Sequence, residues 1–397
     1  MSFEPLDLYA LDELLSPEDR QLRGRVREWV ERNYLPVVSG HYEQGTFPLE
    51  LAKQIASFGA FGGNIQGYGC AGLTALQYGL ILQELERGDT GLRTFASVQG
   101  ALAMNAIHTF GSEEQKQRWL PAMARGEKLG CFGLTEPDHG SNPGGMVTQA
   151  RKTASGYVLN GSKMWIGLGT VADVAVVWAK VDGLPGIAPE SPRAIRGFLV
   201  ERGTAGFSTE LMEGKLSMRA ANTSRLKFND CELPETCLLP QSQGLKSPLQ
   251  CLNHARYGIV WGVLGAAMAC FDEARNYAKQ RIQFGKPIAA FQLVQRKLAL
   301  MATELTKAQL LAFRLAQLKQ AGKASFVQIS LAKRNNVACA LDIARTTRDI
   351  LGGVGILGEH QCFRHMCNLE SVKTYEGTDD MHLLILGEEL TGIGAFA

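Results

Sequence analysis

The sequence predicts an α+β protein of three domains: an N-terminal α-helical domain, a middle antiparallel β domain and a C-terminal four-helix bundle. Three observations predict this order. The first and last thirds of the 397 residues show apolar residues at helical spacing, and the part between them shows short β-branched runs. We expect the domains to span residues 1–128, 129–240 and 241–397.

Capping signals locate the helices of the first domain. Ser16, followed by Pro17 and two acids, is typical of a helix start, and we expect that helix to end before Pro36. Further helices are expected after Pro48, from about Leu73 to Gly88, after Gly91, and after the capping box that begins at Ser112.

Strand signals begin near Leu129 and end near Pro240. Tyr157 to Leu159 leads into Asn160-Gly161, which is the strongest two-residue hairpin signal. Similar runs cover residues 172–179, 195–200 and 226–228. These short runs predict a compact antiparallel sheet.

The last third contains four helical patterns with short connections, which predict a bundle. They are Leu252 to Ile282, Phe291 to Lys319, Phe326 to Leu351 and Met381 to Leu390.

Composition excludes several classes of protein. A net charge of +2 gives no electrostatic basis for binding nucleic acid or a membrane surface. The longest uncharged run, Tyr257 to Phe271, is too short for a bilayer span, which needs ~20 residues. Nine cysteines without a Cys-x-x-Cys pair favour reduced thiols in the cytoplasm and no metal site. The acidic N-terminus, with Glu4 and Asp7, does not resemble a signal or transit peptide.

One stretch near the end, Lys373 to Asp380, combines a glutamate with a helix start. Glu376 stands between Tyr375 and Gly377, and Thr378 is a good N-cap for the apolar run that follows. By itself this pattern also fits a capping turn with a solvated carboxylate.

Five segments, in order along nearly the whole chain, resemble the acyl-CoA dehydrogenase family. They are Cys131 to Ser141, Lys163 to Gly167, Arg281 to Gly285, Leu351 to Gly353, and Tyr375 to Thr378. Three more stretches resemble the glutaryl-CoA dehydrogenases within that family: Glu84 to Arg93, Cys251 to Gly258, and Thr391 to Phe396.

The resemblance implies that Glu376 is the catalytic base and that FAD is the cofactor. Removing a weakly acidic α proton requires a carboxylate whose pKa is raised by an apolar pocket. Some members carry the base at the position of Ala255, which has no carboxylate here. The resemblance also implies a set of residues that bind the flavin. They are Phe132, Leu134, Thr135, Gly140, Ser141, Trp165, Ile166, Gly167, Arg281, Gln292, Gly352, Gly353, Thr378 and Asp380.

For the substrate, the resemblance implies that Arg93 holds the distal carboxylate of glutaryl-CoA. The other residues implied are Glu86, Thr94, Ser97, Ser141, Asn253, Arg256, Tyr375 and Gly377. A buried cation is costly unless it is paired. The alternative is that Arg93 simply pairs with Glu86 across a helix junction.

The implied reaction is oxidation of glutaryl-CoA, loss of CO2 to give crotonyl-CoA, and transfer of electrons to an electron-transferring flavoprotein. Arg281, Gln292 and the turn at Gly353 would reach the FAD of a neighbouring subunit, which implies a homotetramer. Gly353-x-Gly355-x-x-Gly358 also matches a dinucleotide fingerprint, but the preceding residues favour a helix rather than the strand that this motif requires.

Two positions depart from the family pattern, since most members have threonine or serine at Gly167 and asparagine at Val354. Some plant short-chain oxidases share the Trp-Ile-Gly of residues 165–167, so a short-chain dehydrogenase or oxidase is an alternative. Two further alternatives are a glutaryl-CoA dehydrogenase that does not decarboxylate its product and a non-catalytic protein that binds acyl-CoA.

Overall fold

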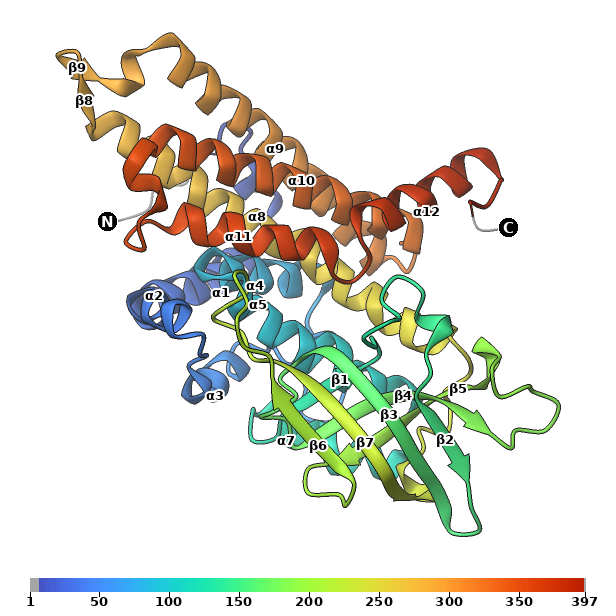
Figure 1. The fold of residues 1–397 in the computed structure, drawn as a ribbon. Helices are drawn as coiled ribbons and strands as arrows, with labels where there is room; N and C mark the ends of the chain where they lie inside the picture. Colours follow the sequence, from blue (N-terminus) through green and yellow to red (C-terminus); the bar gives the residue numbers. More distant parts are fainter. Residues whose placement is uncertain (1–6, 396–397) are drawn as a thin grey trace.

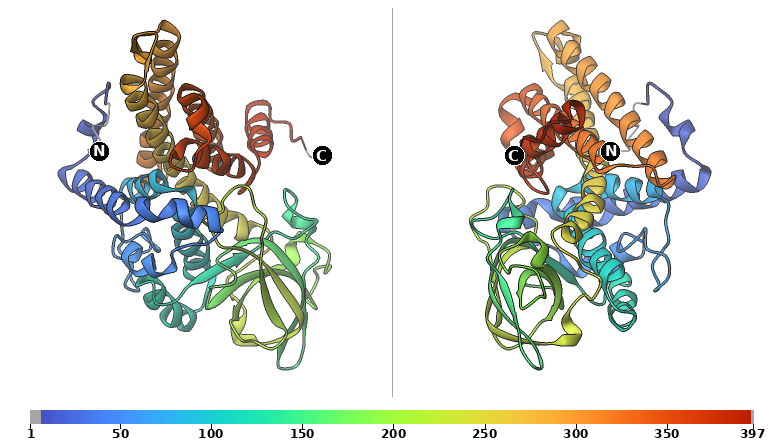
Figure 2. Two further views of the ribbon diagram at one scale, coloured as in Figure 1. Left: turned by 60° about the vertical axis from the view of Figure 1, so that its left-hand side comes forward. Right: turned by 90° about the vertical axis from the view of Figure 1, so that its right-hand side faces the viewer.

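The computed structural model describes residues 7–395 of the chain, so Glu4 and Phe396, which were used above, lie outside it. The chain forms an N-terminal helical part, a middle sheet and a C-terminal helical part, as predicted (Figure 1). In both views of Figure 2 the strands lie on one side of the molecule, below the long C-terminal helices.

The N-terminal helices begin at the residues that the capping signals indicate. Ser16, Thr74 and Ser112 each form a capping box with the residue three positions later. The helices are α1 Pro17–Trp29, α2 Leu35–Gln44, α3 Ala52–Ala56, α4 Ala75–Gly88, α5 Thr90–Ser97, α6 Asn105–Phe110 and α7 Glu113–Ala124.

The predicted helix end before Pro36 is wrong. The chain continues from α1 through a π-helical turn, Val30–Tyr34, into α2, and Pro36 lies in the first turn of α2. A proline inside a continuous helix removes one backbone hydrogen bond, and the ladder is already irregular here because the π-helical turn directly precedes Pro36.

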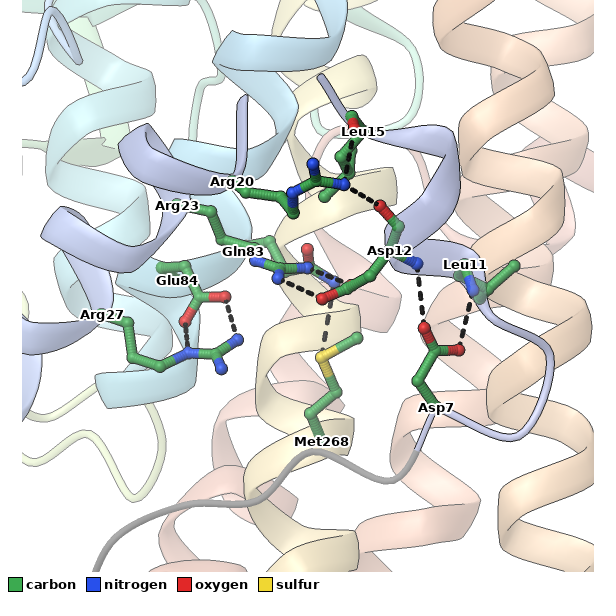
Figure 3. A network of polar contacts seen from close by, with 10 residues as sticks. All are labelled: Asp7, Leu11, Asp12, Leu15, Arg20, Arg23, Arg27, Gln83, Glu84 and Met268. Carbon is green, nitrogen blue, oxygen red and sulfur yellow. Dashed lines mark hydrogen bonds and ion pairs between the residues drawn. The ribbon is translucent and has the colours of Figure 1, made fainter. Parts of the chain in front are cut away.

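Ion pairs fix the segment before α1 and the helix itself (Figure 3). Arg23 pairs with Asp12 at 2.6 Å, and Arg20 donates to the backbone carbonyls of Asp12 and Leu15. Arg27 binds both carboxylate oxygens of Glu84, which is fully buried on α4. These contacts hold α1 against α4, the helix that precedes Arg93.

The middle part is a seven-stranded sheet in the order β1-β4-β2-β3-β7-β6, with β5 paired to β4. The strands are β1 Gly130–Gly133, β2 Gln149–Lys152, β3 Gly156–Gly167, β4 Val174–Asp182, β5 Ile195–Glu201, β6 Phe207–Leu211 and β7 Thr223–Pro234. Four pairings are antiparallel, but β1–β4 and β2–β4 are parallel, so the purely antiparallel prediction is wrong. A parallel pair requires a long connection, and the one after β1 carries Thr135 and Ser141.

The hairpin predicted at Asn160-Gly161 is also wrong, because β3 runs through both residues. The register between β3 and β7 shifts between Leu159 and Gly161, so the pair marks a β-bulge. A Cβ at Gly161 would lie 2.6 Å from Thr148 Oγ1, and the side chain of Asn160 accepts from the amide of Asp230 at 2.8 Å.

The C-terminal helices are α8 Lys246–Gln280, α9 Gln292–Gln320, α10 Phe326–Leu351, α11 Gln361–Thr374 and α12 Asp379–Thr391. A short hairpin of β8 Ile282–Gln283 and β9 Lys286–Pro287 joins α8 to α9. Helix α11 was not predicted, and it lies in the bundle with α8, α9 and α10, whereas α12 leads away from the bundle (Figure 1). Among residues 7–395, no helix combines the length and the apolar character needed to cross a bilayer.

Side chains of the N-terminal helices hold the sheet in place. Gln99 accepts from the amide of Gly130 at 2.8 Å, at the start of β1. Gln115 on α7 donates to the carbonyls of Thr236 and Leu238, just after β7. The sheet is thereby fixed relative to the helices that carry Arg93.

Candidate active site

Glu376 lies on the connection between α11 and α12 in a left-handed conformation, with φ of 54°. Such a conformation is uncommon for a residue with a side chain and persists where its surroundings enforce it. Arg256 Nε donates to the carbonyl of Glu376 at 2.8 Å, and the next residue, Gly377, has φ of 97°. The predicted N-cap is confirmed, since Thr378 Oγ1 accepts from the amide of Met381 at 3.2 Å.

Glu376 is partly exposed, but one of its carboxylate oxygens is shielded from solvent. Its Oε2 is buried and has no hydrogen-bond partner among the described residues. Burial raises the pKa of Glu376, whereas the charges of Arg93, Arg256 and Lys333 lower it. A buried carboxyl with a raised pKa and a free oxygen is suited to accept a proton from a carbon acid.

Arg93 on α5 is completely buried beside Glu376 and Tyr375. Its Nε donates to Glu86 Oε2 at 2.6 Å, and its Nη2 donates to the Tyr375 hydroxyl at 2.5 Å. Thr94 Oγ1 lies 3.5 Å from the same hydroxyl. The alternative pairing with Glu86 therefore exists, but it uses only part of the guanidinium.

Three polar atoms of this cluster are buried without a partner among residues 7–395. They are Arg93 Nη1, Glu86 Oε1 and Ser97 Oγ. Arg93 and Ser97 are four residues apart on α5, so they share one face of the helix. Buried polar groups are nearly always hydrogen-bonded, so these atoms indicate a place for a polar ligand group.

Glycines of α8 make room for this cluster. A Cβ at Gly262 would lie 2.1 Å from Glu86 Oε2 and 3.1 Å from Arg93 Nε. A Cβ at Gly258, one turn earlier, would lie 4.0 Å from Ser97 Oγ. The spacing of these glycines lets α8 approach α4 and α5 closely enough to enclose the ion pair.

A buried joint connects the helix of Arg93 to the helix that leads to Glu376. Asp89 caps α5 by accepting from the amide of Gly91 at 2.6 Å. Its Oδ2 accepts from Arg364 Nε at 3.0 Å and from Asn368 Nδ2 at 2.9 Å, both on α11.

Some of the residues predicted to contact the flavin lie on the loop after β1 and on β3, which are bonded to each other. The amide of Met164 donates to the carbonyl of Thr135 at 2.8 Å. Buried Lys163 donates to the carbonyl of Leu134 at 3.1 Å and to Glu136 Oε1 at 2.8 Å. This pair therefore fixes the loop after β1 against β3.

Trp165 presents an exposed aromatic surface beside this loop. Its side chain is 57% exposed, and its φ is 64°, so the strand turns the indole outward. By contrast, the side chains of Phe132, Leu134 and Ile166 are buried, and Phe132 packs against Trp178 at 5.8 Å between ring centroids. Only their backbone groups are available to a ligand, whereas the predicted Gly140 and Ser141 are exposed.

Gly167 has a steric explanation. A Cβ at this position would lie 3.0 Å from Val98 Cγ2, on the π-helical turn Val98–Met104. A contact this short would require the neighbouring side chain to move. Val98 therefore occupies the space that a side chain at position 167 would need.

Four predicted flavin residues lie away from this loop. Arg281 and Gln292 flank the β8–β9 hairpin, and Gly352 and Gly353 follow α10; all four are exposed. Figure 1 shows the hairpin at the far end of the bundle from the sheet. Because helix α10 precedes the glycines, the dinucleotide fingerprint is excluded. Thr378 and Asp380 lie at the start of α12.

Two residues near Glu376 were missed. Lys333 and His382 are buried beside the loop, and a Cβ at Gly377 would lie 3.0 Å from His382 Nε2. A signal for Lys333 existed, since it occupies the same helical face as the buried Ile329 and Val337. Among the described residues, no group of three or more His, Cys, Asp or Glu is arranged to hold a metal ion.

Family models of the acyl-CoA dehydrogenases match three successive parts of the chain. The N-terminal domain model matches residues 16–127, the middle domain model residues 131–231, and the C-terminal domain model residues 242–391. The chain belongs to the acyl-CoA dehydrogenase family.

Three of the proteins similar to this chain illustrate the range of its relatives. A glutaryl-CoA dehydrogenase from Mycobacterium smegmatis, solved in complex with FADH2, is 49% identical, with a TM-score of 0.95 and full coverage of both chains. The human mitochondrial short-chain specific acyl-CoA dehydrogenase is 34% identical over 94% of this chain and 90% of its own. A structure described as the electron transferring flavoprotein of Acidaminococcus fermentans contains a chain 30% identical, with a TM-score of 0.90, covering 98% of this chain and all of that one.

The cofactor of this acyl-CoA dehydrogenase is FAD. The residues present fit a flavin, because the exposed indole of Trp165 offers a flat aromatic surface. The loop around Thr135 lies next to it through the backbone bond to Met164. Glu376 is carried by the helical part and Trp165 by the sheet, so the two residues come from different parts of the fold.

Proposed function

We propose that this acyl-CoA dehydrogenase oxidises glutaryl-CoA and decarboxylates the product to crotonyl-CoA and CO2. The observation that carries the proposal is the buried guanidinium of Arg93, whose Nη1 is unpaired, together with the unpaired hydroxyl of Ser97 on the same face of α5. A substrate carboxylate would supply the acceptor that both groups lack. The similarity to the M. smegmatis glutaryl-CoA dehydrogenase supports the same substrate.

The energetics favour a dicarboxylyl substrate. A hydrogen bond to a charged group contributes ~1.5–3 kcal/mol, and an apolar butyryl tail would leave the Arg93 donor unpaired. We therefore expect a preference of ~10–100-fold for glutaryl-CoA. The hydroxyl of Tyr375 and Glu86 hold the other edges of the guanidinium, so its orientation is set before the substrate binds.

Glu376 would carry the proton in both halves of the reaction. Its carboxylate takes the α proton of the acyl thioester, and bound FAD supplies the acceptor for the β hydrogen and its two electrons. The C–CO2 bond of the resulting glutaconyl-CoA then breaks, and its electron pair enters a dienolate. Protonated Glu376 returns its proton to the γ carbon, which gives crotonyl-CoA and restores the carboxylate.

A short-chain acyl-CoA dehydrogenase or oxidase is the second candidate. Two observations favour it: the similarity to the human short-chain enzyme, and the ion pair with Glu86, which already neutralises Arg93. A dehydrogenase that releases glutaconyl-CoA without losing CO2 differs from the main proposal in the second step alone.

We also propose that the enzyme is a cytoplasmic homotetramer that passes electrons to an electron-transferring flavoprotein. The Acidaminococcus relative supports this partner. Arg281 and Gln292 are exposed and distant from the flavin loop of their own subunit, which supports a role at a neighbouring one. Phe284, Leu293 and Leu390 are apolar and 92%, 74% and 83% exposed, as expected of an interface.

The test is anaerobic addition of glutaryl-CoA or butyryl-CoA to the yellow protein. We expect fast bleaching and CO2 release with glutaryl-CoA and slower bleaching with butyryl-CoA. In the double variant R93M/E86Q, which removes both buried charges together, the preference should disappear. Faster bleaching by butyryl-CoA would favour the short-chain enzyme, peroxide in air would indicate an oxidase, and bleaching without CO2 would indicate the non-decarboxylating enzyme.

A further inference from the structure

Lys333 is a buried ammonium group next to the catalytic loop. It lies on α10 and is 1% exposed. Its Nζ donates to the carbonyls of Val372 at 3.0 Å, Tyr375 at 3.2 Å and Gly377 at 2.9 Å. An ammonium has three donors, so its capacity is fully used. No carboxylate among residues 7–395 forms an ion pair with it.

The three acceptors belong to one short segment. Val372 is in the last turn of α11, where carbonyls lack helical partners and a cation is favourable. Tyr375 and Gly377 flank Glu376, whose own carbonyl accepts from Arg256. Two buried cations therefore hold three successive carbonyls, from Tyr375 to Gly377.

We propose that Lys333 is a positioning residue that holds Glu376 in the orientation needed for proton transfer. The inference rests on the proposed role of Glu376 as the base. A left-handed glutamate followed by a glycine with positive φ has no secondary structure of its own to fix it. The Lys333 contacts tie this segment to α10, the helix that packs along α8 and α11. Loss of these contacts would let Glu376 move out of reach of the α carbon.

Below a pH of about 7, where it is protonated, Lys333 also acts on Glu376 through its charge. The charged groups that face Lys333 are Glu376 and Asp379, which raise its pKa, and Arg256 and Arg93, which lower it; burial is the larger effect and lowers it to about 7. His382 is neutral here, because burial lowers its pKa to about 3. Since the charge of Lys333 lowers the pKa of Glu376, removing it should raise that pKa.

The test compares K333M, K333Q and wild type, loaded with FAD, on both glutaryl-CoA and butyryl-CoA. In K333M we expect kcat to fall ~10–100-fold with little change in KM, because a displaced base affects the chemical step. The acid side of the pH–kcat profile should move to higher pH in both variants. K333Q, whose amide offers two N–H donors in place of three, should recover part of kcat at high pH.

The matched control is K307M, on α9, whose lysine is exposed and pairs with Glu304. A variant with full flavin absorbance, wild-type kcat and an unmoved acid limb would overturn the inference. If K333M does not fold, K333Q is judged by the same two readouts. A wild-type protein that neither substrate bleaches would instead overturn the proposed function, so the two failures are distinguishable.

Discussion

At the scale of single residues, the proposed reaction depends on one unpaired oxygen. Glu376 Oε2 is buried without a partner, whereas Oδ and Oε atoms of structural carboxylates such as Asp89 and Glu84 accept two or more hydrogen bonds or ion pairs. The free oxygen separates Glu376, the proposed base, from Asp89 and Glu84, and it is shared only with acids such as Glu86 in the same cluster. The same contrast separates Arg93, which keeps a free nitrogen, from Arg364, which binds Asp89 and the carbonyl of Gly88.

Replacing Glu376 with glutamine should abolish most of the activity while retaining the shape of the side chain. A positioned general base contributes ~10²–10⁴-fold, so the rate of flavin bleaching by acyl-CoA should fall by that factor. The control is E370Q on α11, an exposed residue that pairs with Arg345. Turnover by E376Q close to wild type would show that another group removes the proton.

The pH dependence follows from the same residue. The base must be ionised, and burial raises its pKa, so kcat should rise with pH through a pKa above the usual ~4.3 of glutamate. Arg93 lowers this pKa more than Arg256 or Lys333 does. In R93M/E86Q the rise measured with butyryl-CoA should therefore lie at higher pH. An unchanged profile would mean that Arg93 does not act on Glu376.

At the scale of elements, the contact of α8 with α4 and α5 decides whether the Glu86–Arg93 pair can form. G262A adds a carbon 2.1 Å from Glu86 Oε2, and overpacking of this kind costs ~1–3 kcal/mol. We expect a lower melting temperature and a reduced preference for glutaryl-CoA over butyryl-CoA. The control is G24A on α1, where nothing lies within 4 Å and alanine favours the helix. Equal stability of G262A and wild type would show that the helices can separate without loss.

Sequence patterns predicted the elements whose signals are local. Capping boxes at Ser16 and Ser112 marked helix starts correctly because the cap is formed by residues three positions apart. Helix α11 was missed because no capping side chain marks its start, and its position depends on distant contacts such as Arg364 with Asp89. Asn160-Gly161 misled because Gly161 is required by the approach of Thr148, which no local pattern reveals.

The site was predictable to the extent that the family resemblance reached it. That resemblance named Glu376 and Arg93, and the structure brings both into one buried cluster. Lys333 and Gly262 were not named, because their importance lies in what they face: three carbonyls in one case and a carboxylate in the other. Such roles require the tertiary arrangement.

At the scale of the whole molecule, FAD contacts should link the sheet to the helices. A ligand that binds only the folded protein stabilises it, by ~2.7 kcal/mol at a concentration one hundred times its Kd. We therefore expect the protein stripped of FAD to melt at a lower temperature and added FAD to restore the original value. Riboflavin, which lacks the pyrophosphate and adenosine, is the control ligand. A melting temperature independent of FAD would contradict a site between the two parts.

The joint formed by Asp89, Arg364 and Asn368 has a consequence for chain length. It ties the helix of Arg93 to the helix that ends next to Glu376, so the span from guanidinium to base is fixed. The enzyme would then select dicarboxylyl substrates by the length of their acyl chain. Succinyl-CoA, one methylene shorter than glutaryl-CoA, would leave a gap at one end, and adipyl-CoA, one methylene longer, would have to buckle.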